Sequence, residues 1–123
     1  MTQNNRKKGN RGEELARIYL QQQGYHIRHT NWQFGHKELD IVAEKDDLLV
    51  VVEVKSRTTD IFENPEDAVS KKKIRMIIDA TEAYLETYDV DMEVRFDVIA
   101  VLFQPGKAPE IEHFEDAFIS PVW

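Results

Sequence analysis

Cysteine is absent from the 123-residue sequence. This absence excludes disulfide bonds, thiolate nucleophiles and cysteine-ligated zinc sites, and it is typical of the reducing cytosol, so we expect a cytoplasmic protein. Long hydrophobic runs are missing as well, because no apolar stretch approaches the roughly 18 residues that a membrane-spanning helix needs. The basic N-terminal end leads into no hydrophobic stretch, so we expect neither a secretory signal nor a membrane partner.

Proline and glycine are scarce, with four and five residues, and no segment rich in either divides the chain. Hydrophobic residues make up 41% of the sequence, which is enough for one core and excludes a disordered chain. We therefore predict a single domain over residues 11–119, preceded by a flexible, basic tail at residues 1–10.

Positive charge is in deficit, with a net charge of −7, but the charge is unevenly distributed. Residues 1–37 hold seven Lys or Arg and two Asp or Glu, whereas residues 38–123 hold nine and twenty-one. The overall charge argues against non-specific binding of polyanions, although the basic end could still contact one. The acidic C-terminal third would instead suit a basic protein partner, so a protein-interaction domain is one hypothesis.

Hydrophobic periodicity predicts two helices and five strands. We expect one helix at residues 12–23, ended by Gly24, and a second from the turn at residues 64–67 to about residue 88. The expected strands lie at residues 25–32, 38–44, 48–55, 93–103 and 110–114. The third expected strand is apolar on both faces, which indicates a central position. The order predicts an α/β fold in which helices flank a central mixed sheet.

Two neighbouring strands carry acids in otherwise apolar segments, Asp40 in one and Glu53 in the other. If the two-residue turn Asp46–Asp47 joins them, strict alternation along both strands places Asp40 opposite Glu53. A four-residue turn keeps this parity, whereas a three-residue turn separates the two carboxylates onto opposite faces. In the favourable register, like charges about 5 Å apart destabilise a sheet. A bound cation, the ammonium of Lys55 or a shared proton must then offset them.

The residue types in this pair suit a hard divalent cation. Mg²⁺ and similar ions favour one or two carboxylates together with waters and phosphate oxygens. Lys55 lies two residues beyond Glu53 on the same face, where it could hold a phosphate oxygen or orient a water. Asp40, Glu53 and Lys55 around Mg²⁺ or Mn²⁺ would form a workable site for phosphodiester hydrolysis. The alternative is that Glu53 and Lys55 are a solvated strand end.

Residues 38–43 and 51–57 resemble the core of the PD-(D/E)xK nuclease superfamily, which has the restriction-endonuclease-like fold. More closely, the chain resembles the small, uncharacterised YraN family, which is similar to archaeal Holliday-junction resolvases, over about residues 9–118. The resemblance implies an αβββαβ core and a metal-dependent endonuclease acting on DNA, branched or structured DNA included. Resolvase-like nucleases often act as pairs, so it also allows a homodimer.

The resemblance implies a role for each matching residue. Asp40 and Glu53 would bind Mg²⁺ or Mn²⁺, Lys55 would be the catalytic lysine, and Glu13 would be the helix carboxylate that supports the site. The backbone carbonyl of Val54 could add a metal ligand. Two glycines of the family pattern are replaced here, by Lys37 and Glu63. These replacements and the net charge favour the alternative of a non-catalytic nucleic-acid-binding module.

Three basic residues are candidate contacts for a DNA backbone: Arg11, Arg57 and Lys73. Lys73 belongs to a basic run, and such runs are usually a solvated helix face. Asp97 is unusual in an apolar strand, and it could bind Arg95, cap the second helix or support the site.

Overall fold

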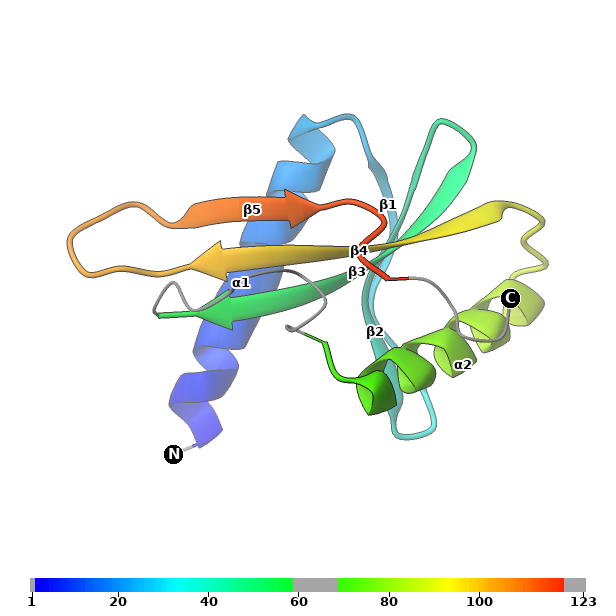
Figure 1. Ribbon diagram of the computed structural model, residues 1–123, viewed down its shortest axis with the longest axis horizontal. Helices are drawn as coiled ribbons and strands as arrows, with labels where there is room; N and C mark the ends of the chain where they lie inside the picture. Colours follow the sequence, from blue (N-terminus) through cyan, green and yellow to red (C-terminus); the bar gives the residue numbers. More distant parts are fainter. Residues whose placement is uncertain (1, 59–68, 119–123) are drawn as a thin grey trace.

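The computed structural model describes residues 2–58 and 69–118, with side chains described from Arg11 onward. In these residues, one five-stranded sheet lies between two helices (Figure 1). The elements are α1 (Thr2–Gln22), β1 (His26–Phe34), β2 (Lys37–Lys45), β3 (Leu48–Arg57), α2 (Lys71–Thr87), β4 (Glu93–Leu102) and β5 (Glu110–Phe114). This order confirms the predicted αβββαβ core and mixed sheet flanked by helices.

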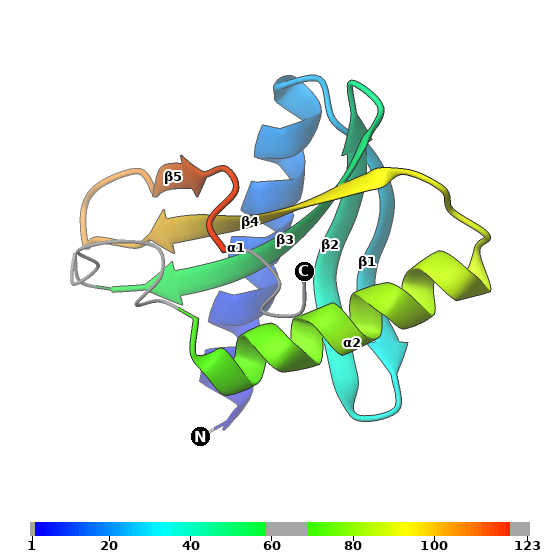
Figure 2. The same ribbon diagram turned by 45° about the vertical axis from the view of Figure 1, so that its right-hand side comes forward.

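The sheet runs in the chain order β1-β2-β3-β4-β5. Strands β3 and β4 pair in parallel, whereas the other neighbouring pairs are antiparallel. The parallel pair requires a long crossover, and α2 lies within it. Strand β3 is therefore central, as its apolar sequence predicts, and it has a helix against each of its faces (Figure 2).

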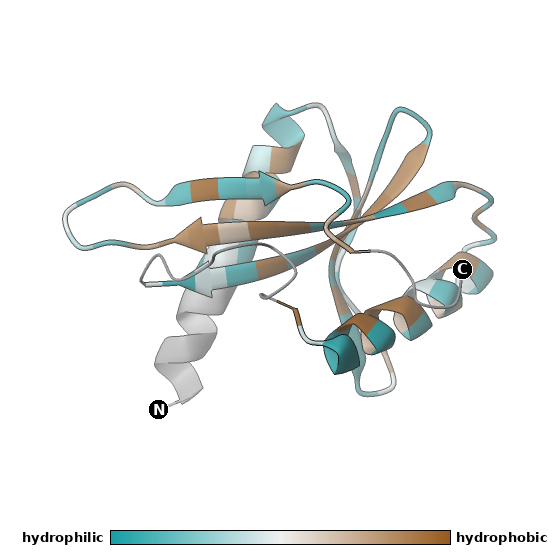
Figure 3. Cartoon of the chain, viewed as in Figure 1, coloured by the Kyte–Doolittle hydropathy of each residue, from teal (hydrophilic) through white to brown (hydrophobic). Residues whose placement is uncertain are grey.

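Two apolar clusters hold the helices on the two faces of the sheet. On the α1 side, Ala16 and Leu20 pack against alternate residues of the strands, including Val50 and Val52. On the α2 side, Ile77 and Tyr84 belong to the other cluster, and Figure 3 shows the hydrophobic stripe along α2. Fully burying side chains of this size stabilises the fold by roughly 1.5–3 kcal/mol each.

Two helix starts differ from the prediction. Helix α1 begins at Thr2 rather than residue 12, so residues 2–10 of the predicted tail are helical, while their flexibility stays a prediction. Helix α2 begins at Lys71, because the extended backbone of Ser70 stops it there and the Ser70 hydroxyl accepts the N–H of Lys73 at 3.1 Å. The helix opening predicted at residues 64–67 lies outside the described residues. The prediction of one continuous helix from there to residue 88 was wrong, because residues 69–70 are not helical.

Two glycines fix where α1 lies. At Gly12 the helix crosses β3 so closely that an added Cβ would collide with the hydroxyl of Ser56. At Gly24 the backbone adopts φ +92°, and the next N–H, from Tyr25, donates to the carbonyl of Leu20 at 2.9 Å. The predicted helix end at Gly24 is thus confirmed. Neither of the two helices in the described residues combines the length and apolar character needed to cross a membrane.

Candidate functional site

The β2–β3 hairpin brings the two predicted carboxylates together. Both turn residues, Asp46 and Asp47, have positive φ angles of 51° and 67°, as in a type I′ turn. The two-residue turn is therefore confirmed, and it pairs the strands from Lys45 opposite Leu48 onward. Regular pairing stops at Ile41 and Val52, one residue before the acids.

Asp40 lies where β2 separates from β3. Its Oδ2 accepts the backbone N–H of Val54 at 2.9 Å. Asp40 is 8% exposed and Glu53 5% exposed, and the two carboxyl groups interact electrostatically. The structure thus brings Asp40, Glu53 and Val54 to one point, as the hairpin register predicts.

Strict alternation along β2 fails at Asp40, which corrects the parity assumed from the sequence. Leu39 packs with Val42 in the α2-side cluster, whereas Ile41 packs in the α1-side cluster. On the neighbouring strand, Asn31 has a φ of 52°, a conformation that asparagine tolerates better than most residues. This irregular backbone lets Asp40 turn toward Glu53 while the residues beside it stay in the two cores.

Two lysines converge on Glu53. The Nζ of Lys55 lies 3.5 Å from Glu53 Oε2, and the Nζ of Lys73 lies 3.7 Å from the same oxygen. Lys55 comes from the same strand face, whereas Lys73 comes from the first turn of α2, which Ser70 caps. Lys73 is thus not merely part of a solvated helix face, and Glu53 lies between two ammonium groups.

The acids at this site resist ionisation. Burial raises the pKa of Asp40 to about 7, and the charge of Glu53 adds to the shift against the opposing Val54 N–H. Burial likewise raises the pKa of Glu13 to about 7, with a contribution from the charge of Asp40. Ionising these buried carboxyl groups destabilises the fold unless a cation binds beside them.

Asp40→Asn is expected to stabilise the metal-free protein by about 2–4 kcal/mol at pH 8. The folded pKa of Asp40 lies above its ordinary value of 3.8, so wild-type stability falls as the pH rises from about 4 to 7 and stays lower above that. An amide can still accept the Val54 N–H without carrying charge. Urea unfolding from pH 4 to 8 in EDTA checks this. Equal stabilities at every pH would contradict it.

Glu13 reaches the site from α1, and Asn31 holds it. Asn31 hydrogen-bonds the carboxylate of Glu13, and both line a hollow of about 240 Å³ beside the hairpin. Asn31 is not among the site residues predicted from the sequence. A single asparagine within a strand, where a positive φ is needed, was the available signal.

Two other predicted DNA contacts lie beside the acidic pair rather than within it. The guanidinium of Arg11 stacks over the ring of Phe103, 5.2 Å from its centroid. Arg57 ends β3, and its Nη1 donates to the carbonyl of Ser56 at 3.0 Å. The structure therefore groups Asp40, Glu53, Lys55, Lys73 and Glu13, and places Arg11 and Arg57 on the flank next to them.

The donor set fits a hard cation with few protein ligands. Among the described residues, no three or more His, Cys, Asp or Glu side chains are arranged to hold a metal ion. Mg²⁺ needs no such cage, because it keeps several waters and commonly binds one or two carboxylates plus substrate phosphates. Asp40 and Glu53 supply two carboxylates. The Val54 carbonyl and the metal itself stay predictions.

Comparison with known sequences identifies the family. The sequence model of the uncharacterised protein family UPF0102 matches residues 12–101. The chain belongs to this family. A UPF0102 protein of Phocaeicola vulgatus is 54% identical over 116 residues, covering 94% of both chains. One from Parabacteroides distasonis is 49% identical over 113 residues, covering 92% of this chain and 93% of the relative. UPF0102 is the YraN family, so membership confirms the resemblance to that family. The matched range contains the residues of the acidic site, which are Glu13, Asp40, Glu53, Lys55 and Lys73.

Among solved structures, the UPF0102 chain is similar to Hjc, a Holliday junction resolvase from the archaeal hyperthermophile Archaeoglobus fulgidus. The TM-score is 0.46 at 15% sequence identity, and the alignment covers 86% of this chain and 85% of Hjc.

Proposed function

We propose that this protein is a Mg²⁺- or Mn²⁺-dependent nuclease that hydrolyses phosphodiester bonds in DNA. The observation that carries the proposal is the convergence of two buried carboxylates, Asp40 and Glu53, with the ammonium groups of Lys55 and Lys73. Burying like charges side by side costs stability, so the arrangement serves the fold poorly. Such perturbed acids with a charged partner are typical of functional sites.

Each residue would have a distinct role. Asp40 and Glu53, with the Val54 carbonyl, would hold the cation, which would act as a Lewis acid and lower the pKa of a bound water. Lys55 would hold a non-bridging phosphate oxygen and orient the attacking water, because its ammonium already lies 3.5 Å from Glu53. Glu13, across the site on α1, would position that water and accept its proton.

The N-terminal end of α2 is suited to a polyanionic substrate. Its first turn carries Lys71, Lys72 and Lys73 at the positive end of the helix dipole, and Figure 3 shows this hydrophilic start. Cations there are unfavourable in isolation by a few tenths of a kcal/mol each, and phosphates bound at this end would offset that cost. DNA phosphates would also meet Arg57 and Arg11 on the flank.

A cleavage assay tests the proposal. We expect purified protein to cut at least one member of a panel of single-stranded, duplex and four-way-junction DNA with Mg²⁺ or Mn²⁺, and none in EDTA. Glu53→Gln should reduce the rate by roughly 10²-fold or more, because it removes a ligand charge. Glu112→Gln, at an exposed position on β5, is the matched control and should cut normally.

Two results would contradict a nuclease. One is cleavage that persists in EDTA or in Glu53→Gln at the wild-type rate. The other is the absence of cleavage on every substrate, with DNA binding that survives both Asp40→Asn and Glu53→Gln. The second result would identify the alternative, a nucleic-acid-binding module without catalysis.

A further inference from the structure

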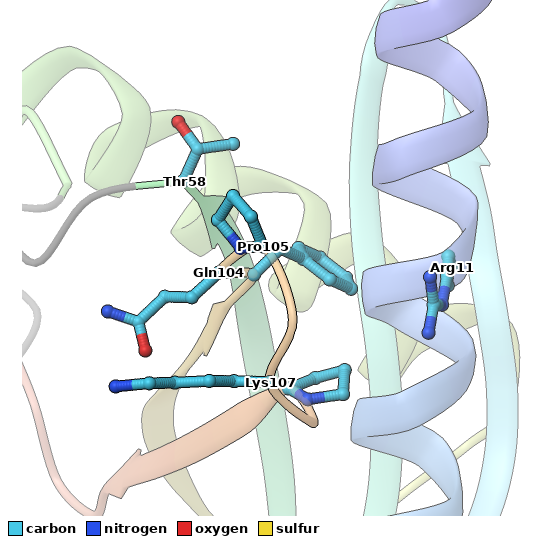
Figure 4. Close-up of a pocket in the computed structure, with 7 residues that line it drawn as sticks. Arg11, Thr58, Gln104, Pro105 and Lys107 are labelled. Atoms are coloured by element: carbon cyan, nitrogen blue, oxygen red, sulfur yellow. The ribbon is translucent and has the colours of Figure 1, made fainter.

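A second hollow lies on the flank of the acidic site, between α1 and the connection from β4 to β5. It has a volume of about 410 Å³, within the range of roughly 300–1,000 Å³ typical of small-ligand pockets. Arg11 contributes one wall from α1, and Phe103, Pro105 and Lys107 contribute the other. Figure 4 shows Arg11 on the helix, facing the side chains of the connection across the hollow.

The lining is positively charged in a strongly acidic part of the chain. It includes Arg11 and Lys107 and no acidic side chain. After residue 78 the sequence holds two basic residues and eleven acidic ones, and Lys107 is one of those two. A hollow lined by two cations and no acid, in a part of the chain where acids predominate, is suited to bind an anion.

The lining also offers a flat apolar surface. Phe103 is partly exposed, and the guanidinium of Arg11 stacks on it at 5.2 Å from the ring centroid. Pro105 and Pro109 add apolar side walls. Aromatic rings and Arg planes in positively charged grooves bind unpaired bases by stacking, whereas the bases of a duplex have their faces covered.

The hollow lies near the acidic site along β3. Thr58, one of its lining residues, comes three after Lys55. At roughly 3.3 Å per strand residue, Thr58 lies about 10 Å beyond Lys55. The N–H of Phe103 donates to the carbonyl of Arg57 at 2.8 Å, which fixes the connection beside the end of β3.

We propose that this hollow holds an unpaired nucleotide of the DNA strand that passes through the acidic site. The base takes the place of the Arg11 guanidinium on the face of Phe103, and the displaced guanidinium binds the adjoining phosphate together with Lys107. This inference rests on the proposed function for its choice of DNA, and it names single-stranded or locally unpaired DNA as the preferred substrate. It predicts binding that needs no metal, because no carboxylate lines the hollow.

Binding of a fluorescein-labelled oligothymidylate and of a duplex of equal length, both in EDTA, tests the proposal. Phe103→Leu should weaken oligothymidylate binding by about tenfold and leave duplex binding unchanged, because stacking is lost but apolar volume is kept. Arg11→Gln should reduce the steepness of the plot of log affinity against log salt concentration by about 0.7, because one phosphate contact is lost. Phe34→Leu and Arg75→Gln, at exposed positions on β1 and α2, are the matched controls.

The outcomes separate this inference from the nuclease proposal. If Phe103→Leu binds oligothymidylate as tightly as Phe34→Leu does, or loses duplex binding equally, the nucleotide pocket is wrong even when metal-dependent cleavage is observed. If no substrate is cut but Phe103→Leu and Lys107→Gln still lose single-strand binding selectively, the pocket stands and the nuclease is wrong. Lys107 is exposed, so its variant tests the pocket without disturbing the core.

Discussion

Lys55→Ala is expected to reduce the rate of DNA cleavage by roughly 10²–10³-fold, the loss typical of removing one group that stabilises transition-state charge. The ammonium of Lys55 lies 3.5 Å from Glu53 Oε2, so it is placed to meet a phosphate held beside that carboxylate. Its removal also deletes a positive charge that competes with a cation for Glu53. Affinity for Mn²⁺ should therefore be unchanged or higher while cleavage is lost.

Single-turnover cleavage and Mn²⁺ titration of the same preparations measure this separation. Arg75→Ala is the control, because Arg75 is an exposed cation on α2 beyond the first turn. If Lys55→Ala cuts DNA at the rate of Arg75→Ala, Lys55 has no part in the chemistry. If it loses Mn²⁺ binding together with cleavage, its role is to hold the site together rather than to act on substrate.

Asp97→Asn is expected to lower the free energy of unfolding by about 3 kcal/mol, the effect of removing one partner from a buried ion pair. Asp97 is fully buried on β4. Arg95 donates to both of its oxygens at 2.9 and 2.8 Å, and His113 Nε2 lies 2.7 Å from Oδ2. The N–H of Asp116 donates to Oδ1 at 3.0 Å. An amide cannot satisfy these donors, and the charge of Arg95 would lose its partner.

Acid titration adds a second signature for Asp97. Burial alone would raise its pKa, but hydrogen bonds from His113, Arg95 and the Asp116 N–H outweigh burial and hold the pKa below 3.8. Its contribution is therefore present above about pH 4 and lost as the pH falls through the lower folded pKa. The difference in the free energy of unfolding between wild type and Asp97→Asn, measured by urea unfolding, should therefore become smaller below pH 4.

Asp79→Asn is the control for Asp97→Asn. Asp79 pairs with Lys37 at 3.0 Å on the surface of α2, where an ion pair contributes about 1 kcal/mol or less. Similar losses in Asp79→Asn and Asp97→Asn would show that burial of the Asp97 network adds nothing to stability.

The sequence was sufficient to predict the acidic pair because strand geometry has a period of two. Once the turn at Asp46–Asp47 has two residues, the register of the hairpin follows, and Asp40 must come beside Glu53. The irregular backbone at Asp40 could not be predicted from β2, since the alternating pattern of residues 38–41 continues through it, and Asn31 was the available signal on β1. The irregularity depends on how the two cores draw Leu39 and Ile41 to opposite faces.

Long-range packing decided what the sequence left open. Asp97 had three candidate roles, and the structure shows the first of them, the bond to Arg95. The sequence could not show that β5 and the residues after it bring His113 and the Asp116 N–H to the same carboxylate. The helix starts were missed for a local reason. The polar residues before Gly12 were interpreted as a tail, although such residues also form helices. At α2, the proline at position 65 was taken as the start of the helix in place of the Ser70 cap.

Binding of Mn²⁺ to the wild type, Asp40→Asn and Glu53→Gln shows whether the two carboxylates hold one hard cation together. Titration followed by the electron paramagnetic resonance of free Mn²⁺ measures affinity and stoichiometry without DNA. We predict one ion per wild-type chain and a loss of affinity of roughly tenfold or more in each variant, since each removes a ligand charge. Wild-type affinity in both variants would show that these two carboxylates do not hold the ion.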